Sequence, residues 1–273
     1  MTSSHAIRTA VLALAVCASG ASTAATITNA ELSAVRWTGF DWDSNGSALI
    51  TGFQPVAGSA FDLELYAWAG VIKNGITYTT ALLDQNPDGI PDHAGGYEYT
   101  MYAKLRESVI FCVADVCTFT IVGGRYEIWY DPAQNANRNT STGFRDGIAL
   151  ITGSFGTQTV GSLAFIGGSA FGVTALTGGV DFTNTAWIQP ELTTTSYSTT
   201  LQSGEFHTNG WTPPVSFDGY TPVTGDLIFQ ADANQSFAVD EPGALALVGA
   251  SMIGLGLFGR RPRRRAQASS RAV

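Results

Sequence analysis

The sequence predicts an all-β protein with an antiparallel sandwich or jelly-roll-like body, an N-terminal signal peptide and a C-terminal membrane helix. Three observations support the body. Apolar and polar residues alternate with period two, β-branched and aromatic residues are enriched in these runs, and Gly, Asn and Asp separate them. No long stretch of the body has helical apolar spacing, so many short strands favour sheet packed on sheet.

The chain divides into four parts. Residues 1–25 contain Arg8, an apolar run at 10–18 and small residues at 22–25, which is typical of a secretory signal peptide. Residues 26–238 form the β-rich domain, which this signal predicts to be exported. Residues 239–265 contain an apolar segment at 243–258, and residues 266–273 are the predicted cytoplasmic tail.

The strands of the body follow from its alternating runs. They are predicted at 47–53, 61–72, 76–82, 97–112, 116–122, 125–130, 147–153, 161–166, 171–177, 192–201 and 225–231. Asn74-Gly75 suits the two-residue turn of a hairpin. Residues 203–222 are predicted to be a loop.

Two cysteines remain after the predicted signal peptide, Cys112 and Cys117. In an oxidising compartment an isolated pair is most simply a disulfide. The residues around them form two strands about Ala114-Asp115, so a two-residue loop places the cysteines opposite each other in an antiparallel ladder. We therefore predict a disulfide in a β-hairpin.

The charge of the body is strongly acidic. All 22 acidic residues lie between residues 31 and 241, together with seven of the 14 basic residues, so this region carries 7 − 22 = −15. A body of this charge repels phosphate backbones, which argues against nucleic-acid binding. It is compatible with divalent cations and with neutral or cation-bridged polysaccharide.

One loop has the spacing of a calcium site. Asp84, Asn86, Asp88 and Asp92 place oxygen donors at positions 1, 3, 5 and 9, and position 6 is a glycine that allows a sharp turn. Position 12 is a glycine where a bidentate acid is expected, and Glu98 is a more distant substitute. The alternative is an Asp/Asn/Gly-rich surface turn that binds no metal. Residues 41–46 begin in the same way but are predicted to be a turn, because Leu49 stands at position 9.

Neither nucleophilic catalysis nor acid–base catalysis has a clear signature. The body has no Gly-x-Ser-x-Gly elbow and only His93 and His207. Glycoside hydrolysis needs two carboxylates at a suitable separation, which a sequence does not reveal. Most of the six tryptophans are predicted to lie in the core, whereas Trp211, in the Pro-rich loop, is the best candidate for stacking on a sugar ring.

The C-terminal part has three successive features. Asp240-Glu241-Pro242 leads into the uncharged segment 243–258, and basic residues follow it directly: Arg260, Arg261, Arg263, Arg264 and Arg265. A 16-residue helix spans about 24 Å, slightly less than a hydrocarbon core of about 30 Å. The arginines would hold that end in the cytoplasm. This arrangement resembles the PEP-CTERM sorting signal, although Asp240 replaces the first proline of Pro-Glu-Pro. The resemblance implies processing by an exosortase after transient inner-membrane anchoring.

Several body segments resemble flocculation-associated PEP-CTERM proteins. Residues 40–48 read FDWDSNGSA, residues 126–137 read YEIWYDPAQNAN, residues 142–153 read TGFRDGIALITG, and residues 229–237 read FQADANQSF. The resemblance implies a surface or extracellular-matrix protein that associates with exopolysaccharide or cell-surface glycan and promotes floc or biofilm formation. It assigns no catalytic residues, so a non-enzyme is expected. The alternatives are an extracellular carbohydrate-binding module and a secreted glycoside hydrolase.

Overall fold

The computed structural model describes residues 25–28, 35–74, 77–78, 80–157, 160–208 and 210–239. These residues belong to one unit of the chain, Ala24–Asp240. The elements are β1 (Ala25–Ile27), β2 (Val35–Trp37), β3 (Gly39–Thr51), β4 (Ala60–Lys73), β5 (Thr77–Tyr78), β6 (Glu98–Val113), β7 (Val116–Asp131), β8 (Ile148–Phe155), β9 (Val160–Ile166), β10 (Ser169–Thr183), β11 (Ile188–Gln189), β12 (Leu192–Gln202), the 3-10 helix η1 (Gly204–Phe206) and β13 (Leu227–Val239). The prediction of an all-β antiparallel body is confirmed.

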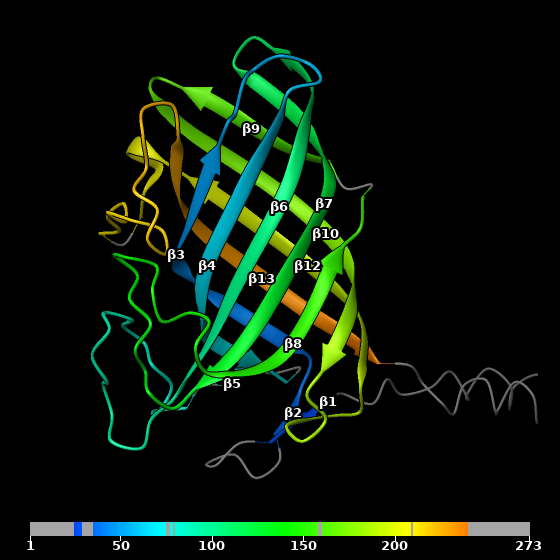
Figure 1. Cartoon of the computed structure of the whole chain (residues 1–273), viewed down its shortest axis with the longest axis vertical. Helices are drawn as coiled ribbons and strands as arrows, with labels where there is room; N and C mark the ends of the chain where they lie inside the picture. The colour runs from blue at the N-terminus through cyan, green and yellow to red at the C-terminus, as the bar shows by residue number, and fades with distance from the viewer. Residues whose placement is uncertain are drawn as a thin grey trace, which may run out of the picture. The chain divides into compact units, whose positions relative to one another are not determined.

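The main sheet closes into an eight-stranded antiparallel barrel (Figure 1). Around the barrel the order is β3, β4, β6, β7, β8 with β9, β10, β12 and β13, and β13 pairs back onto β3. Strands β8 and β9 occupy the same position in this order, end to end beside β7: β8 pairs with Gly124–Tyr130 of β7, and β9 pairs with Val116–Thr120. The predicted sandwich or jelly-roll-like arrangement is therefore replaced by a barrel whose strands follow one another in chain order, except that β8 and β9 both lie between β7 and β10.

Three local predictions need correction. Of the strand predicted at 76–82, the structure describes only β5, Thr77–Tyr78, as a strand, and residues 80–82 are not part of one. Residues 41–46 are not a turn between strands but an irregular part of β3, because the pairing with β4 passes from Trp42 directly to Ser47. The Asx turn from Asn45 N–H to Asp43 Oδ1, 2.9 Å, forms within this bulge. The strands predicted at 116–122 and 125–130 are one strand, β7, because Gly123 and Gly124 continue the pairing with β6.

The β6–β7 hairpin contains the predicted disulfide. Cys112 pairs with Cys117 in the ladder, and their Cα atoms are 4.0 Å apart. Ala114 in the two-residue loop has φ of 52°, as the tight connection requires. The disulfide prediction is confirmed.

The barrel interior is a packed apolar core rich in aromatic rings. In β4 the inward positions are Phe61, Leu63, Leu65, Ala67 and Ala69, all buried, which is the period-two pattern expected of a wall with one face inside. The small sheet of β1, β2 and β11 contributes Ile27, Trp37 and Ile188 to the same core. It therefore covers one end of the barrel, at the bottom of Figure 1.

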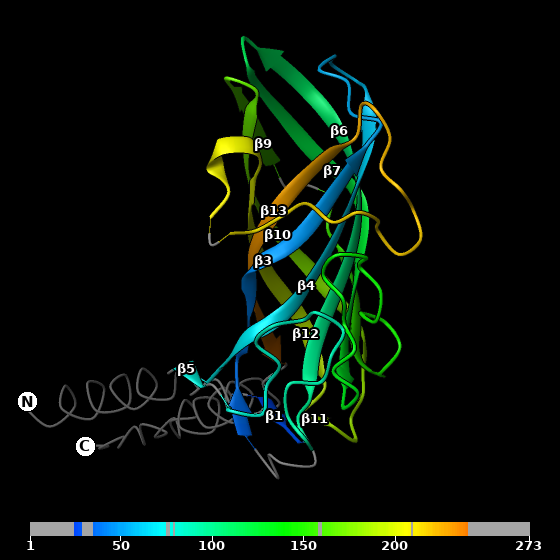
Figure 2. The same cartoon turned by 90° about the vertical axis from the view of Figure 1, so that its left-hand side faces the viewer.

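Three long connections, at 80–97, 132–147 and 203–226, gather on one side of the barrel (Figures 1 and 2). A second, smaller apolar cluster lies there, outside the barrel wall. Its buried members are Leu49, Tyr66, Trp68, Tyr102, Ala136, Phe144 and Phe217. These outward-facing aromatic residues of β4 and β6 anchor the connections to the wall, and the anchored loops shape the site described next.

Candidate functional site

The predicted targeting signals of the chain lie outside the described residues. These are the signal peptide, apart from Ala25, and Asp240, Glu241, Pro242 and the five arginines between residues 260 and 265. Within the ranges that the structure describes, no helix is long and apolar enough to cross a membrane. The sorting signal therefore stays a prediction.

The four residues of the predicted calcium loop differ in their exposure to solvent. Asp84 is buried, whereas Asn86, Asp88 and Asp92 are exposed. Asp84 Oδ1 accepts the Asn86 N–H at 2.9 Å, and Asp88 Oδ1 accepts the Ile90 N–H at 2.9 Å. These are the Asx turns of the metal-free alternative. In the described part of the chain, no group of three or more His, Cys, Asp or Glu side chains is placed to hold a metal ion.

Trp211 does not present a free face for a sugar. It is 4% exposed, and its ring centre lies 4.5 Å from that of His207. Burial lowers the pKa of His207. The loop that contains Trp211 folds back onto the barrel, where Gln230 Oε1 accepts the Thr208 N–H at 2.9 Å. The expectation that Trp211 is an exposed stacking residue is wrong.

A different tryptophan lines a pocket. A cavity of about 430 Å³ lies beside Trp129, and its lining residues are Trp129, Ser141, Gly143, Phe144, Arg145, Asp146 and Asp218. Ile128 and Tyr130 point into the barrel core, so Trp129 between them faces outward. The Trp129 indole N–H and the Ser141 hydroxyl are buried and have no hydrogen-bond partner among the described residues. Both are therefore unpaired polar groups in the wall of the pocket.

Arg145 is held in a fixed orientation at this pocket. Its Nε and Nη2 donate to the two carboxylate oxygens of Glu127 at 2.9 and 3.0 Å. The guanidinium carbon lies 4.3 Å from the centre of the Tyr102 ring. A two-point ion pair and a stacked aromatic ring together restrict the side chain, so the guanidinium is positioned before any ligand arrives.

The pocket wall is built from two connections that hydrogen-bond to each other. Asn139 C=O accepts the Val215 N–H at 2.8 Å, and Thr140 C=O accepts the Asp218 N–H at 3.0 Å. Thr100 Oγ1 on β6 donates to the Phe144 carbonyl at 2.9 Å and ties the first connection to the barrel. Asp218 comes from the second connection, so the site forms only when both are in place.

The chemistry of this pocket suits a polyhydroxylated ligand. A half-buried indole offers an aromatic surface, Arg145 supplies donors, and Asp146 and Asp218 supply acceptors. Sugar rings have an apolar face that stacks on aromatic residues and hydroxyl groups that bond to such side chains. The outward position of Trp129 was readable from the sequence, because polar Arg125 and Glu127 share its alternation while Tyr126, Ile128 and Tyr130 are apolar.

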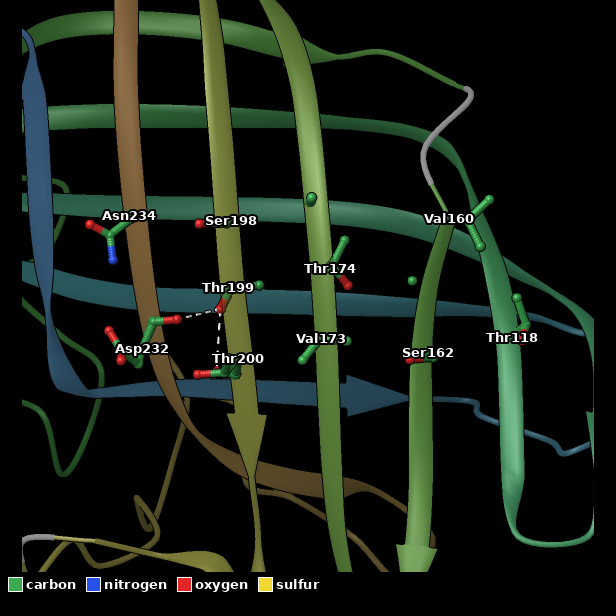
Figure 3. Close-up of a pocket in the computed structure, with 12 residues that line it drawn as sticks. Thr118, Val160, Ser162, Val173, Thr174, Ser198, Thr199, Thr200, Asp232 and Asn234 are labelled. Atoms are coloured by element: carbon green, nitrogen blue, oxygen red, sulfur yellow. Dashed lines mark hydrogen bonds between the residues drawn. The ribbon is translucent and has the colours of Figure 1, made fainter.

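A larger groove, of about 570 Å³, runs along β9, β10, β12 and β13 (Figure 3). Its lining is mainly small side chains, such as Ser162, Ser198 and Thr200, with Asp232 and Asn234 at one side. Burial, and then the nearby carboxylates of Asp41 and Asp43, raise the pKa of Asp232. The groove has no aromatic ring among its lining residues, so it offers less to a sugar than the pocket beside Trp129.

Comparisons with known proteins identify no relative: no family model, no curated protein and no solved structure matches the chain.

Proposed function

We infer that the protein is an exported, non-enzymatic surface or extracellular-matrix protein that binds exopolysaccharide or cell-surface glycan through the pocket beside Trp129. The observation that carries this inference is the convergence of an outward indole, a fixed guanidinium and two carboxylates in one cavity. Binding of this kind would link cells to a polysaccharide matrix and promote flocs or biofilm.

The sequence resemblance supports the same pocket. The segments 126–137 and 142–153, which resemble flocculation-associated proteins, contribute five of its lining residues: Trp129, Gly143, Phe144, Arg145 and Asp146. Ser141 lies between the two segments. Two of the four resembling segments thus meet at one cavity, which supports a shared ligand class as the reason for that part of the resemblance.

A second candidate is a glycan hydrolase, because Asp146 and Asp218 line the same cavity. Hydrolysis needs a carboxyl group that stays protonated near neutral pH. The release of reducing ends, measured as described below, separates this candidate from binding.

The binding test compares two aromatic truncations. Trp129→Ala removes the stacking surface, and Phe182→Ala removes a 46%-exposed ring elsewhere on β10. Affinity electrophoresis in gels containing exopolysaccharide from the producing cells should show retardation of the wild type and Phe182→Ala but not of Trp129→Ala. Equal retardation of all three proteins at equal melting temperature would contradict the proposal that the glycan binds in this pocket. Release of reducing ends that is lost in Asp146→Asn or Asp218→Asn would establish the hydrolase instead.

The proposed route to the cell surface is tested separately. We propose that residues 1–25 direct export, and that an exosortase processes the segment 239–265 near Asp240-Glu241-Pro242. Cell fractions from strains expressing the full chain and a chain lacking 239–265 are analysed by intact-protein mass. A mature C-terminus near Pro242 and a surface location lost on deletion are expected. An uncut tail in the inner membrane would contradict the processing.

A further inference from the structure

Two buried carboxyl groups, Asp84 and Glu98, lie together beneath the connections at 80–97 and 132–147. They are 1% and 0% exposed. The Asp84 N–H donates to the carbonyl of Tyr97, the residue before Glu98, at 2.9 Å. Glu98 Oε1 accepts the N–H groups of Asn135 and Ala136 at 2.9 and 3.0 Å. The pair therefore joins one connection to the other.

One oxygen of each carboxyl group lacks a donor. Asp84 Oδ2 and Glu98 Oε2 are buried and have no hydrogen-bond partner among the described residues. The groups that act on Asp84 from nearby are the carboxyls of Asp92 and Glu98, and neither Asp84 nor Glu98 forms an ion pair with a described basic residue. Buried carboxylates that face each other need a shared proton or a cation between them.

A third buried oxygen comes from a neutral side chain, Gln134, which directly precedes Asn135, the residue whose N–H bonds to Glu98. Gln134 is 1% exposed, and its Nε2 donates to the His93 carbonyl at 2.9 Å. Its amide lies against Gly96, where an added Cβ would be 2.6 Å from Nε2. Gln134 Oε1 is buried and has no hydrogen-bond partner among the described residues. This unpartnered amide oxygen is an observation independent of the two acids, because leaving a buried amide oxygen without a donor or a ligand is costly.

These oxygens have the character of ligands for a hard cation. Calcium takes six to eight oxygen ligands from carboxylates, amide and backbone carbonyls, and water. Two carboxylates and one amide oxygen would provide part of such a shell, and water and backbone carbonyls would complete it. Histidine and cysteine are not among these ligands, so a soft transition metal is not favoured.

We propose that a divalent cation of the calcium class binds between Asp84 and Glu98, with Gln134 as a third ligand. The cation would fasten the connection at 80–97 to the connection at 132–147, which lines the pocket beside Trp129. This site differs from the predicted loop site, in which the chain wraps the ion by itself. Asp88 is exposed and already accepts the Ile90 N–H, so it takes no part.

The test measures calcium directly and needs no glycan. Full-length protein freed of metal with a chelator is titrated with calcium by calorimetry, and its melting temperature is followed with calcium and with excess chelator. We expect saturable binding and a rise in melting temperature with calcium. Glu98→Gln keeps the side-chain shape but weakens binding at least tenfold, whereas the matched variant Asp88→Asn binds as the wild type does.

Asp84→Asn serves as a second ligand variant if Glu98→Gln does not fold, because Asn can still accept the Asn86 N–H. Its calcium affinity should also fall at least tenfold. The proposal is overturned if the folded wild type neither binds calcium nor changes its melting temperature. It is also overturned if Asp88→Asn loses calcium while Glu98→Gln or Asp84→Asn retains it. None of these outcomes depends on polysaccharide binding, so the pocket and the cation site can fail independently.

Discussion

Arg145 and Glu127 form a two-point ion pair on the outside of the barrel, with Nε–Oε2 and Nη2–Oε1 distances of 2.9 and 3.0 Å. The two residues come from different elements, since Glu127 is on β7 and Arg145 lies in the connection that follows it. The pair joins this connection to the barrel wall and aims the guanidinium at the pocket.

Replacing Arg145 by Lys should therefore affect both binding and stability. Lysine cannot make the two parallel hydrogen bonds or stack flat on Tyr102. We expect loss of glycan binding and about 1 kcal/mol lower unfolding free energy, measured by gel retardation and urea titration. Arg125→Lys is the matched control, because Arg125 is 59% exposed and contacts Glu127 through one 3.7 Å pair. Similar losses in the two variants would contradict the role of Arg145.

Glu107 makes stability depend on pH. It points into the apolar barrel interior between Phe61 and Ile121, and its Oε2 has no hydrogen-bond partner among the described residues. Burial raises its pKa from 4.5 to about 8. The folded state thus holds a proton that the unfolded state releases, so unfolding free energy should fall as pH rises from about 4.5 to about 8. At about 1.4 kcal/mol per pKa unit, the loss reaches several kcal/mol at most.

Glu107→Gln isolates this contribution. The amide cannot ionise, so the variant should be more stable than the wild type at pH 9, with little difference at pH 4.5. Thermal melts at the two pH values measure the effect. A difference between variant and wild type that is the same at both values would show that folding does not raise the pKa of Glu107.

The disulfide should contribute modestly to stability. It closes a loop of only a few residues, so a chain-entropy argument gives about 2 kcal/mol. The double variant Cys112→Ser, Cys117→Ser should melt at a lower temperature under oxidising conditions and should match the reduced wild type. Val113→Ser with Val116→Ser changes the adjacent exposed cross-strand pair and should leave the melting temperature nearly unchanged. No change in the cysteine variant would contradict this contribution.

Two glycines should respond differently to alanine. A Cβ at Gly153 would lie 2.3 Å from both the Gly179 carbonyl oxygen and the Tyr126 hydroxyl, so β8 would have to move away from β10. A Cβ added at Gly123 on β7 would have no other heavy atom within 4 Å. We expect Gly153→Ala to lower the unfolding free energy by about 1–3 kcal/mol. Gly123→Ala should change it little, and denaturant titrations that rank the two variants in the opposite order would contradict the tight β8 contact.

The sequence determined the class of structure and the hairpin disulfide of this protein. Period-two alternation and the spacing of Cys112 and Cys117 are local patterns, and local patterns specify strands and the pairs across a short turn. The sequence named Asp84 only as one of four ligands of a calcium loop; that Asp84 is buried while Asn86, Asp88 and Asp92 are exposed came from the fold.

Only the tertiary structure decided between a sandwich and a barrel. Both present one apolar face to a core, so alternation is the same in each, and closure depends on pairing between β3 and β13 at opposite ends of the domain. The same limit applies to the sites. Asp218 joins the pocket of Trp129 because the connections at 132–147 and 203–226 meet on the barrel wall. The burial of Trp211 was decided by the fold too.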